Sequence, residues 1–360
     1  MTLRRLKILR NAGATLAAAL MTSAAWANAP ATPPARSSVF FATETASLGP
    51  LQRPNAAVVQ RMVDRLVTAA TGKPTAATAW ASLVEKKDTV GIKVSAAGGA
   101  TSGTHPEVVD AVVRGLQSAG VPASRIIVWD RNLEDLLAAG FRRNNSDYQL
   151  RWVDPREGYD KKTQVSAPVL GKLIWGDSSF GEKAGKKMSD YLSNGDQLSS
   201  QSRYSKILSS QVTKIINIPS LTDSFLTGIN GALSSIVLGN IDNWRRFTKR
   251  PMFGDPYIAE IYNDPIIRDK IVFTILDALV LQYAGGPMPN PQFVADYYTI
   301  FAGFDPIAID ATAARLLDEY RKPSKLPSLI SLTLWLHTAN ALGLGNSAED
   351  QIDLINAPEK

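Results

Sequence analysis

Residues that could bind an anion are concentrated in the segment GGATSGTH at positions 98–105. The spacing of its glycines is that of a phosphate-binding loop, but Thr104 and His105 stand where that motif requires Lys followed by Ser or Thr. The sequence therefore lacks a nucleoside triphosphatase signature. The hydroxyls of Ser102 and Thr104, together with Lys93 just before the loop, remain as candidate ligand-binding groups at the start of a helix.

The same loop also has a structural interpretation, because Thr104 and Glu107 fit a capping box for a helix that begins at Pro106. His105 is the candidate catalytic residue of this segment, since an imidazole at the carboxyl end of a strand can transfer protons. The dipole of the following helix disfavours the imidazolium, so we expect a neutral ring near pH 7. A histidine at a helix start could equally cap the helix or pack against it.

Three carboxylates form the second group of candidates. Asp277 follows a predicted strand, and the segment DPIAID at 305–310 follows another strand and opens a helix. If these strands are parallel, their carboxyl ends share one edge of the sheet, where Asp277 or Asp305 could exchange protons with His105. Asp305 and Asp310 could hold Mg²⁺ or Ca²⁺ there, because hard cations prefer oxygen ligands. The alternative is that Asp305 caps its helix and Asp310 faces the helix dipole.

Hydrophobic patterns predict the elements that position these residues. The predicted strands are 90–94, 125–130, 149–153, 170–175, 214–218, 270–276 and 297–301, and the predicted helices are 55–70, 106–119, 133–139, 256–262, 307–320 and 327–342. The strand–helix–strand unit from 90 to 130 implies parallel strands with a helical crossover. Asn217, near the end of its predicted strand, joins the candidate ligand-binding residues.

These elements indicate an α/β fold with a largely parallel sheet flanked by helices. From about 142 to 210 the sequence is rich in Asn, Ser, Gly and Lys and has no sustained period, which predicts an irregular α+β insertion. The predicted domain covers 54–345 and is followed by a C-terminal tail at 346–360. His337 lies in an apolar helical pattern, and we expect it in the core or in an interface.

Composition excludes several kinds of site. The 360 residues include no cysteine and only two histidines, which rules out disulfides, thiolate zinc sites, cysteine nucleophiles and multi-histidine metal cages. The net charge of +6 comes mostly from the first ten residues: without the four basic side chains there, 35 basic residues remain against 33 acidic ones. We therefore expect no nucleic-acid partner.

The N-terminus has the three parts of an export signal. Basic residues end at Arg10, a soft apolar run covers 12–21, and Ala25-Trp-Ala27 fits a cleavage site. Residues 1–27 are therefore predicted to be a signal peptide for the Sec or the twin-arginine route, and 28–53 a flexible proline-rich spacer. The predicted location is periplasmic or secreted. No transmembrane segment is expected in the mature chain, because the apolar run is shorter than the roughly 20 residues of a spanning helix.

Short motifs that follow one another from about Val90 to Tyr320 resemble the domain of unknown function 362 family. They are Ile92-Lys93 with HPEVV at 105–109, INIP at 216–219, TGINGAL at 227–233 with Leu238-Gly239, Asp277-Ala278, Gly286-Pro287 and DPIAID at 305–310. The resemblance implies an α/β fold whose motif loops gather on one side of a sheet.

The chain differs from the usual family pattern at three places. Val94-Ser95 replaces Pro-Asn, SLTD at 220–223 replaces a segment with Lys-x-His, and Ser234-Ser235 replaces Lys-Asn. The basic side chains expected to face a substrate or a cluster are therefore largely absent. Many relatives also carry ferredoxin-type cysteine motifs, and the lack of cysteine here excludes an iron–sulfur cluster held by this chain.

Two functions fit this sequence. The first is an exported protein with a ligand-binding or catalytic crevice at the carboxyl ends of the strands, where Lys93 would orient a small polar or anionic ligand. His105 would then move protons together with an aspartate, in a lyase, an isomerase or a hydrolase. The second is a catalytically silent periplasmic binding or assembly protein, with the segment at 142–210 as its partner-facing surface.

Overall fold

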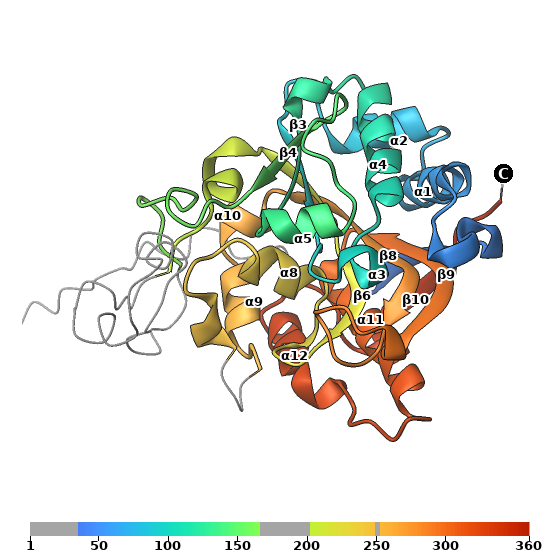
Figure 1. Cartoon of the computed structure of the whole chain (residues 1–360), viewed down its shortest axis with the longest axis vertical. Coiled ribbons are helices and arrows are strands. Elements are labelled where there is room, and N and C mark those ends of the chain that lie inside the picture. Colours follow the sequence, from blue (N-terminus) through green and yellow to red (C-terminus); the bar gives the residue numbers. More distant parts are fainter. Residues whose placement is uncertain (1–34, 166–201, 249–252, 360) are drawn as a thin grey trace, which may run out of the picture.

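A mostly parallel sheet forms the centre of the protein (Figure 1). The computed structural model describes residues 35–165, 202–248 and 253–359. The strand order is β10-β1-β9-β8-β5-β2-β3-β4, and β6 joins β8 and β7 outside this path. The strands are β1 Ser37–Thr43, β2 Val90–Val94, β3 Ile126–Asp130, β4 Gln149–Trp152, β5 Lys214–Ile218, β6 Ser220–Ser224, β7 Gly228–Ile229, β8 Ile271–Gln282, β9 Val294–Gly303 and β10 Ile352–Asn356.

Strands β2, β3, β4, β5 and β8 run parallel to their neighbours in this part of the sheet. The strands β2 (VGIKV) and β3 (IIVWD) are buried along their whole length, as expected for parallel strands that have helices on both faces. This confirms the predicted α/β class and its largely parallel sheet. Strand β9 is the exception among the predicted strands, because it pairs antiparallel with β8.

Helices cover both faces of the sheet. The helices are α1 Ala56–Thr71, α2 Ala76–Leu83, α3 Gly99–Ser102, α4 Pro106–Ser118, α5 Leu133–Ala138, α8 Ala232–Leu238, α9 Tyr257–Tyr262, α10 Pro265–Arg268, α11 Pro306–Arg321 and α12 Leu334–Ala341. One core holds the apolar side chains of α1, α2 and α4, and a second core holds those of α8, α9, α11 and α12. The sheet separates the two cores.

The side chains of β2 show how the sheet sorts residues between the two faces. Ile92 and Val94 join the core with α1, α2 and α4, whereas Lys93 points to the opposite face and reaches Ser235 of α8. Successive residues of a strand must alternate in this way. The same alternation places Ile216 beside Ile92 and leaves Asn217 on the face of α8.

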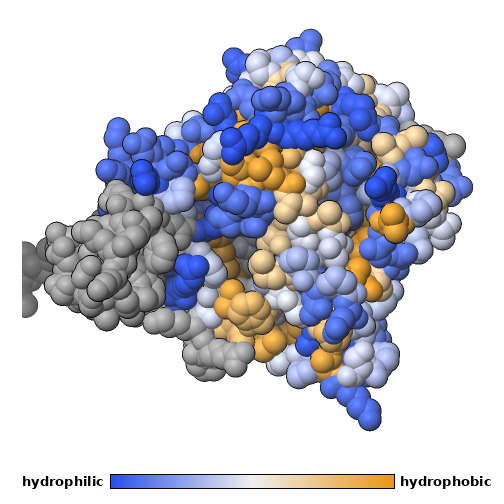
Figure 2. Space-filling view, in the orientation of Figure 1, coloured by the Kyte–Doolittle hydropathy of each residue, from blue (hydrophilic) through white to orange (hydrophobic). Residues whose placement is uncertain are grey.

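Helix α4 follows the pattern that predicts it. Val109, Val112 and Leu116 lie on one buried stripe, Pro106 occupies the first turn, and Gly120 adopts the left-handed conformation beyond its end with φ of 92°. Figure 2 shows a largely hydrophilic surface over the region of α2 and α4. The amphipathic pattern therefore predicts both the helix and the face that it buries.

The structure corrects the two predicted ends of the domain. Residues 37–43, assigned to the flexible spacer, form β1, which lies between β10 and β9. Residues 352–356, assigned to the C-terminal tail, form β10 at the edge of the same sheet. The sheet therefore joins the two ends of the described chain. Their hydrogen-bond partners are about 300 residues away in sequence, as Ser37 and Ile352 show, and no local pattern reveals such pairing.

Three smaller expectations also change. The strand predicted at 149–153 forms β4 of the main sheet, and the strand predicted at 170–175 lies outside the described residues. The helix predicted at 327–342 is a short 3₁₀ turn at 330–332 followed by α12, and His337 is exposed on α12 instead of lying in a core. Within the described ranges, every helix is too short or too polar to cross a membrane.

Candidate functional site

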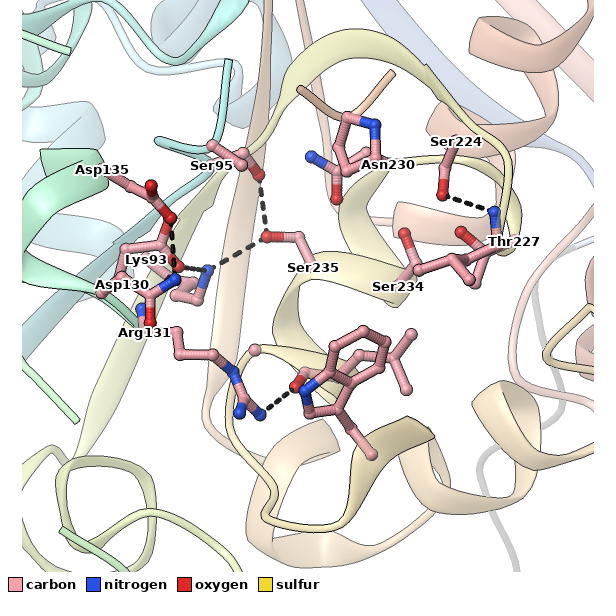
Figure 3. Close-up of a pocket in the computed structure, with 17 residues that line it drawn as sticks. Lys93, Ser95, Asp130, Arg131, Asp135, Ser224, Thr227, Asn230, Ser234 and Ser235 are labelled. Atoms are coloured by element: carbon pink, nitrogen blue, oxygen red, sulfur yellow. Dashed lines mark hydrogen bonds and ion pairs between the residues drawn. The ribbon is translucent and has the colours of Figure 1, made fainter. Parts of the chain in front are cut away.

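A cavity of about 160 Å³ lies at the carboxyl ends of β2 and β3 (Figure 3). Its wall is formed by residues just after these two strands, by the first turn of α5, by the loop that follows β6, and by α8. Apolar side chains such as Leu238 and Trp244 form part of this wall, and several polar side chains also line it: Lys93, Ser95, Asp130, Asp135, Asn230 and Ser235. Carboxyl ends of parallel strands are the usual place of ligand sites in open α/β sheets. This cavity is therefore the candidate site.

Lys93 forms the buried base of the cavity wall, with a side chain that is only 1% exposed. Its ammonium donates to the carbonyl of Val94 at 2.6 Å, to Oδ1 of Asp130 at 2.8 Å and to Oγ of Ser235 at 3.1 Å. A lysine ammonium has three donors and no acceptor. All three N–H groups therefore already have partners.

Asp130 is fixed as firmly as Lys93. Its Oδ2 accepts from the backbone N–H of Ala96 at 2.7 Å, and its Oδ1 accepts from the backbone N–H of Arg131 at 2.7 Å in addition to Lys93. A buried ion pair is tolerated only when such additional hydrogen bonds satisfy its remaining lone pairs. The pair also ties the turn after β3 to the end of β2.

Two serines extend this network towards the cavity. Oγ of Ser235 and Oγ of Ser95 are 2.8 Å apart. Because Lys93 can only donate, Ser235 accepts from Lys93, and either serine can donate the hydrogen that lies between their two oxygens. In either direction one of the two hydroxyls keeps a hydrogen for another acceptor, and both serines line the cavity. Hydrogen bonds in such a chain polarise one another, so when Ser235 donates to Ser95 the charge of Lys93 makes Ser95 a stronger donor.

A second acidic group, Asp135, lines the cavity beside Asp130 and Lys93 (Figure 3). Oδ2 of Asp135 accepts from the side chain of Asn132 at 2.8 Å, whereas Oδ1 of Asp135 has no hydrogen-bond partner among the described residues. Burial raises the pKa of Asp135, the bond from Asn132 lowers it, and the nearby charge of Asp130 raises it further. Asn230 also contributes its side-chain amide to the wall.

His105 and Asp277, both predicted as catalytic residues, form a direct pair outside this cavity. Nδ1 of His105 and Oδ2 of Asp277 are 2.8 Å apart, and the same oxygen accepts from the backbone N–H of His105 at 2.8 Å. Burial lowers the pKa of His105, but the charge of Asp277 and its hydrogen bond outweigh burial, so the pKa is raised. This direction is opposite to the one expected from the helix dipole alone.

The pair lies on the other side of the sheet from Lys93. Leu276 and Ala278, which flank Asp277 in β8, join the core with α8 and α11. Side chains alternate along a strand, so Asp277 points to the other face, towards the N-terminus of α4. His105 is the N-cap residue of α4, in the place predicted for Thr104. A carboxylate at a helix N-terminus stabilises the helix. The geometry therefore gives the pair a structural role.

Ser102 and Thr104, predicted as ligand-binding residues, are buried and bonded within the protein. Oγ of Ser102 donates to Oε1 of Gln282 at 3.0 Å. Oγ1 of Thr104 donates to the carbonyl of Ile218 at 2.7 Å and accepts from the backbone N–H of Ser95 at 2.9 Å. These hydroxyls connect the glycine-rich loop to β5 and β8 and hold Ser95 in place.

Strand β9 runs antiparallel to β8, so the carboxyl end of β9 lies at the end of the sheet opposite the cavity. Asp305, which follows β9, therefore lies away from the cavity. Oδ1 of Asp305 caps α11 through the N–H groups of Ile307 and Ala308, at 2.9 and 3.1 Å. Oδ2 accepts from Oγ of Ser37 at 2.6 Å and from the N–H of Asn346 at 2.8 Å. The capping interpretation of this motif is therefore confirmed.

Asp310 and Asn217 hold the first turn of α8 from two sides. Asp310 accepts from the N–H groups of Ala232 at 2.6 Å and Leu233 at 2.9 Å, and burial raises its pKa to about 7. The side chain of Asn217 donates to the carbonyl of Ala232 at 2.9 Å. In the described part of the chain, no group of three or more His, Asp or Glu residues is placed to hold a metal ion.

Lys93 is the predicted site residue that lines the cavity, whereas Asp130, Ser95, Ser235 and Asp135 are not among the predicted site residues. The sequence could have indicated Asp130, because it stands at the carboxyl end of a predicted strand, as Asp277 does. Acids at the carboxyl ends of parallel strands lie along the same edge of the sheet. Ser95 and Ser235 stand at positions where the family pattern has other residues, and Asp135 lies in the first turn of a predicted helix. Only the folded chain brings these four residues together.

Comparison with known proteins gives a family and distant structural likenesses. The model of a family described as a domain of unknown function, DUF362, matches residues 90–315. No curated protein sequence matches the chain. A structural-genomics protein from Thermotoga maritima is 14% identical over 76% of this chain and 60% of its own, with a TM-score of 0.34. The lactate racemase apoprotein from Thermoanaerobacterium thermosaccharolyticum is 15% identical over 66% of this chain and 51% of its own, with a TM-score of 0.33.

The chain thus spans 60% or less of either solved protein. Likenesses at these TM-scores support no statement about function. The site therefore has to be interpreted from its own residues.

Proposed function

The chain belongs to the DUF362 family, and we propose that the cavity beside α8 binds a small, uncharged polar molecule through the hydroxyl of Ser95. The hydrogen-bonded chain from Lys93 through Ser235 to Ser95 is the observation that carries this proposal. With Ser235 donating to Ser95, the chain ends in the Ser95 hydroxyl hydrogen at the cavity wall. A ligand oxygen, from a carbonyl or a hydroxyl, is the natural acceptor.

The charges around the cavity favour an uncharged ligand. Lys93 and Asp130 neutralise each other, and the guanidinium of Arg131 donates to the carbonyls of Leu238 and Ile241. Arg131 keeps its positive charge and Asp135 adds a negative one, so the four charged groups of the wall sum to zero. A carboxylate or phosphate could recruit Lys93 only by replacing one of its existing acceptors, so the expected contact between Lys93 and an anionic ligand has no support from this geometry.

The volume limits the size of the ligand. A cavity of about 160 Å³ suits a molecule of a few heavy atoms and is far smaller than the roughly 300–1,000 Å³ of sites for drug-sized ligands. Three-carbon hydroxycarbonyl compounds have the required size, an acceptor oxygen and hydroxyls for Asp135 and Asn230. Dihydroxyacetone is therefore a suitable probe, and pyruvate is its anionic counterpart of similar size.

Isothermal titration calorimetry with these two probes tests the proposal. We expect dihydroxyacetone to bind more tightly than pyruvate. Ser95→Ala should weaken dihydroxyacetone binding about tenfold, which corresponds to about 1.4 kcal/mol and to one good hydrogen bond. Ser82→Ala, which removes an exposed serine hydroxyl on α2, is the matched control. Tighter binding of pyruvate, or equal binding by the Ser95→Ala variant, would contradict the proposal.

We also propose that the protein is exported and that the mature chain begins at Asn28. This proposal rests on the basic, apolar and small-residue parts of the sequence before Asn28. Mass spectrometry of the fractionated protein should find a mature chain outside the cytoplasm. Arg4→Lys with Arg5→Lys distinguishes the routes, because it removes the twin arginine and preserves the charge. If the native protein and the double variant both stay in the cytoplasm and keep residues 1–27, export is refuted.

A further inference from the structure

The cavity contains one acidic group that the structure leaves available. Helix α5 is held by the buried side chains of Leu133 and Leu136, and its first turn brings Asp135 to the cavity wall (Figure 3). One carboxylate oxygen of Asp135 accepts from Asn132, and Oδ1 has no hydrogen-bond partner within the described residues. Asp135 therefore has a lone pair free to act on a bound molecule.

The other charged groups of the wall are committed to the protein. Lys93 and Asp130 bond to each other and to neighbouring polar groups, and Arg131 bonds to the backbone after α8. Asp135 and the hydroxyl of Ser95 thus remain as an acceptor and a donor on the same small cavity. This is the pair of groups needed to move a proton on a carbonyl compound, with a base for carbon and a donor for oxygen.

We propose that Asp135 is the acid–base residue of an enolisation catalysed in this cavity, with Ser95 holding the carbonyl oxygen. This inference rests on the proposed binding site. Asp135 removes a proton from the carbon next to the carbonyl, the electron pair of that C–H bond forms a C=C bond, and the carbonyl π pair moves to oxygen. The enolate oxygen is stabilised by Ser95, and the Asp135 carboxylic acid returns its proton to carbon. No electron leaves the substrate, so no oxidant or reductant is required.

Two features suit Asp135 to this step. A carboxylate that is partly buried is a stronger base than one in water, and burial is the main reason why the pKa of Asp135 is raised. The hydrogen-bonded chain behind Ser95 ends on the charge of Lys93, so negative charge that develops on the oxygen meets a polarised donor. Neither feature requires a group from outside the chain.

Hydrogen exchange in heavy water tests the inference. The mature protein, from Asn28 to the C-terminus, is incubated with dihydroxyacetone in D₂O. Loss of the C–H signals of dihydroxyacetone is followed by proton NMR. We expect the wild-type protein to accelerate exchange and Asp135→Asn to lower that rate by about 100-fold or more, the scale of general acid–base catalysis. Binding of dihydroxyacetone, measured by calorimetry, should persist in the Asp135→Asn variant. Glu134→Gln, which alters an exposed acid in the same turn of α5, should exchange at the wild-type rate.

Binding and exchange separate the two proposals. Wild-type protein that binds dihydroxyacetone without accelerating exchange, or an Asp135→Asn variant that exchanges at the wild-type rate, would overturn the enolisation and leave the binding site standing. Wild-type protein that does not bind dihydroxyacetone would overturn both proposals.

Discussion

Replacing His105 by Gln should destabilise the fold and leave the cavity intact. The imidazole is nearly buried, and its Nδ1 bonds to a carboxylate of Asp277 whose side chain has no exposed area. Glutamine is similar in size and polar but carries no charge. The backbone N–H of residue 105 would still donate to Asp277, as it does at 2.8 Å in the native protein. The substitution thus removes one charged hydrogen bond without leaving Asp277 unpartnered.

A hydrogen bond to a charged group contributes roughly 1.5–3 kcal/mol, so His105→Gln should lower the free energy of unfolding by about that amount. The loss should depend on pH. Because Asp277 raises the pKa of His105 against the opposing effect of burial, the folded state binds a proton that the unfolded state releases near its ordinary pKa of about 6.5. The pair therefore stabilises fully below about pH 6.5 and loses this contribution as the pH rises through the folded pKa.

Urea unfolding followed by tryptophan fluorescence at pH 6 and pH 9 measures both effects. The difference between wild type and the His105→Gln variant should be larger at pH 6. His337→Gln is a direct control, because His337 is the other histidine of the chain and lies exposed on α12. Dihydroxyacetone binding should be unchanged. Normal stability at both pH values combined with lost binding would refute the structural role and restore the predicted catalytic one.

Two further substitutions test the packing around the cavity. Gly231→Ala would place a Cβ 2.1 Å from Oδ1 of Asp310, so we expect a loss of about 1–3 kcal/mol in urea unfolding, whereas Gly49→Ala, with its nearest atom at 3.5 Å, should be neutral. Lys93→Met would leave the buried Asp130 without its ion-pair partner and should lower stability by about 3–5 kcal/mol. Adding Asp130→Asn to Lys93→Met should recover part of that loss, and a double variant no more stable than the single one would contradict this account.

Local patterns predict the elements whose signal lies within the element itself. The strands β2, β3 and β5 are short apolar runs bounded by turn residues, and α1 and α4 carry buried stripes at helical spacing. Strands β1 and β10 have weaker patterns and form only because they find partners across the whole chain. The sequence therefore predicts the centre of the sheet and misses its edge.

The predicted site separates for two physical reasons. A shift of one position in a strand moves a side chain to the other face, and this places Lys93 towards α8 and Asp277 towards α4. Strand direction decides at which edge a following residue lies, and β9 runs antiparallel, which moves Asp305 to the opposite edge. Residue type and spacing contain neither the register nor the direction of a strand.

The departures from the family pattern, interpreted from sequence as lost functional positions, acquire a different meaning in the folded chain. Ser95 and Ser235 both stand where the family usually has asparagine, and together they form the hydroxyl chain from Lys93 to the cavity. A hydroxyl, like a carboxamide, can accept and donate at the same time, so each replacement preserves the ability to pass on a hydrogen bond. A serine is also shorter than an asparagine, which leaves more room in a cavity of about 160 Å³. Serine at these two positions therefore keeps the ability to pass on a hydrogen bond from Lys93 towards the cavity.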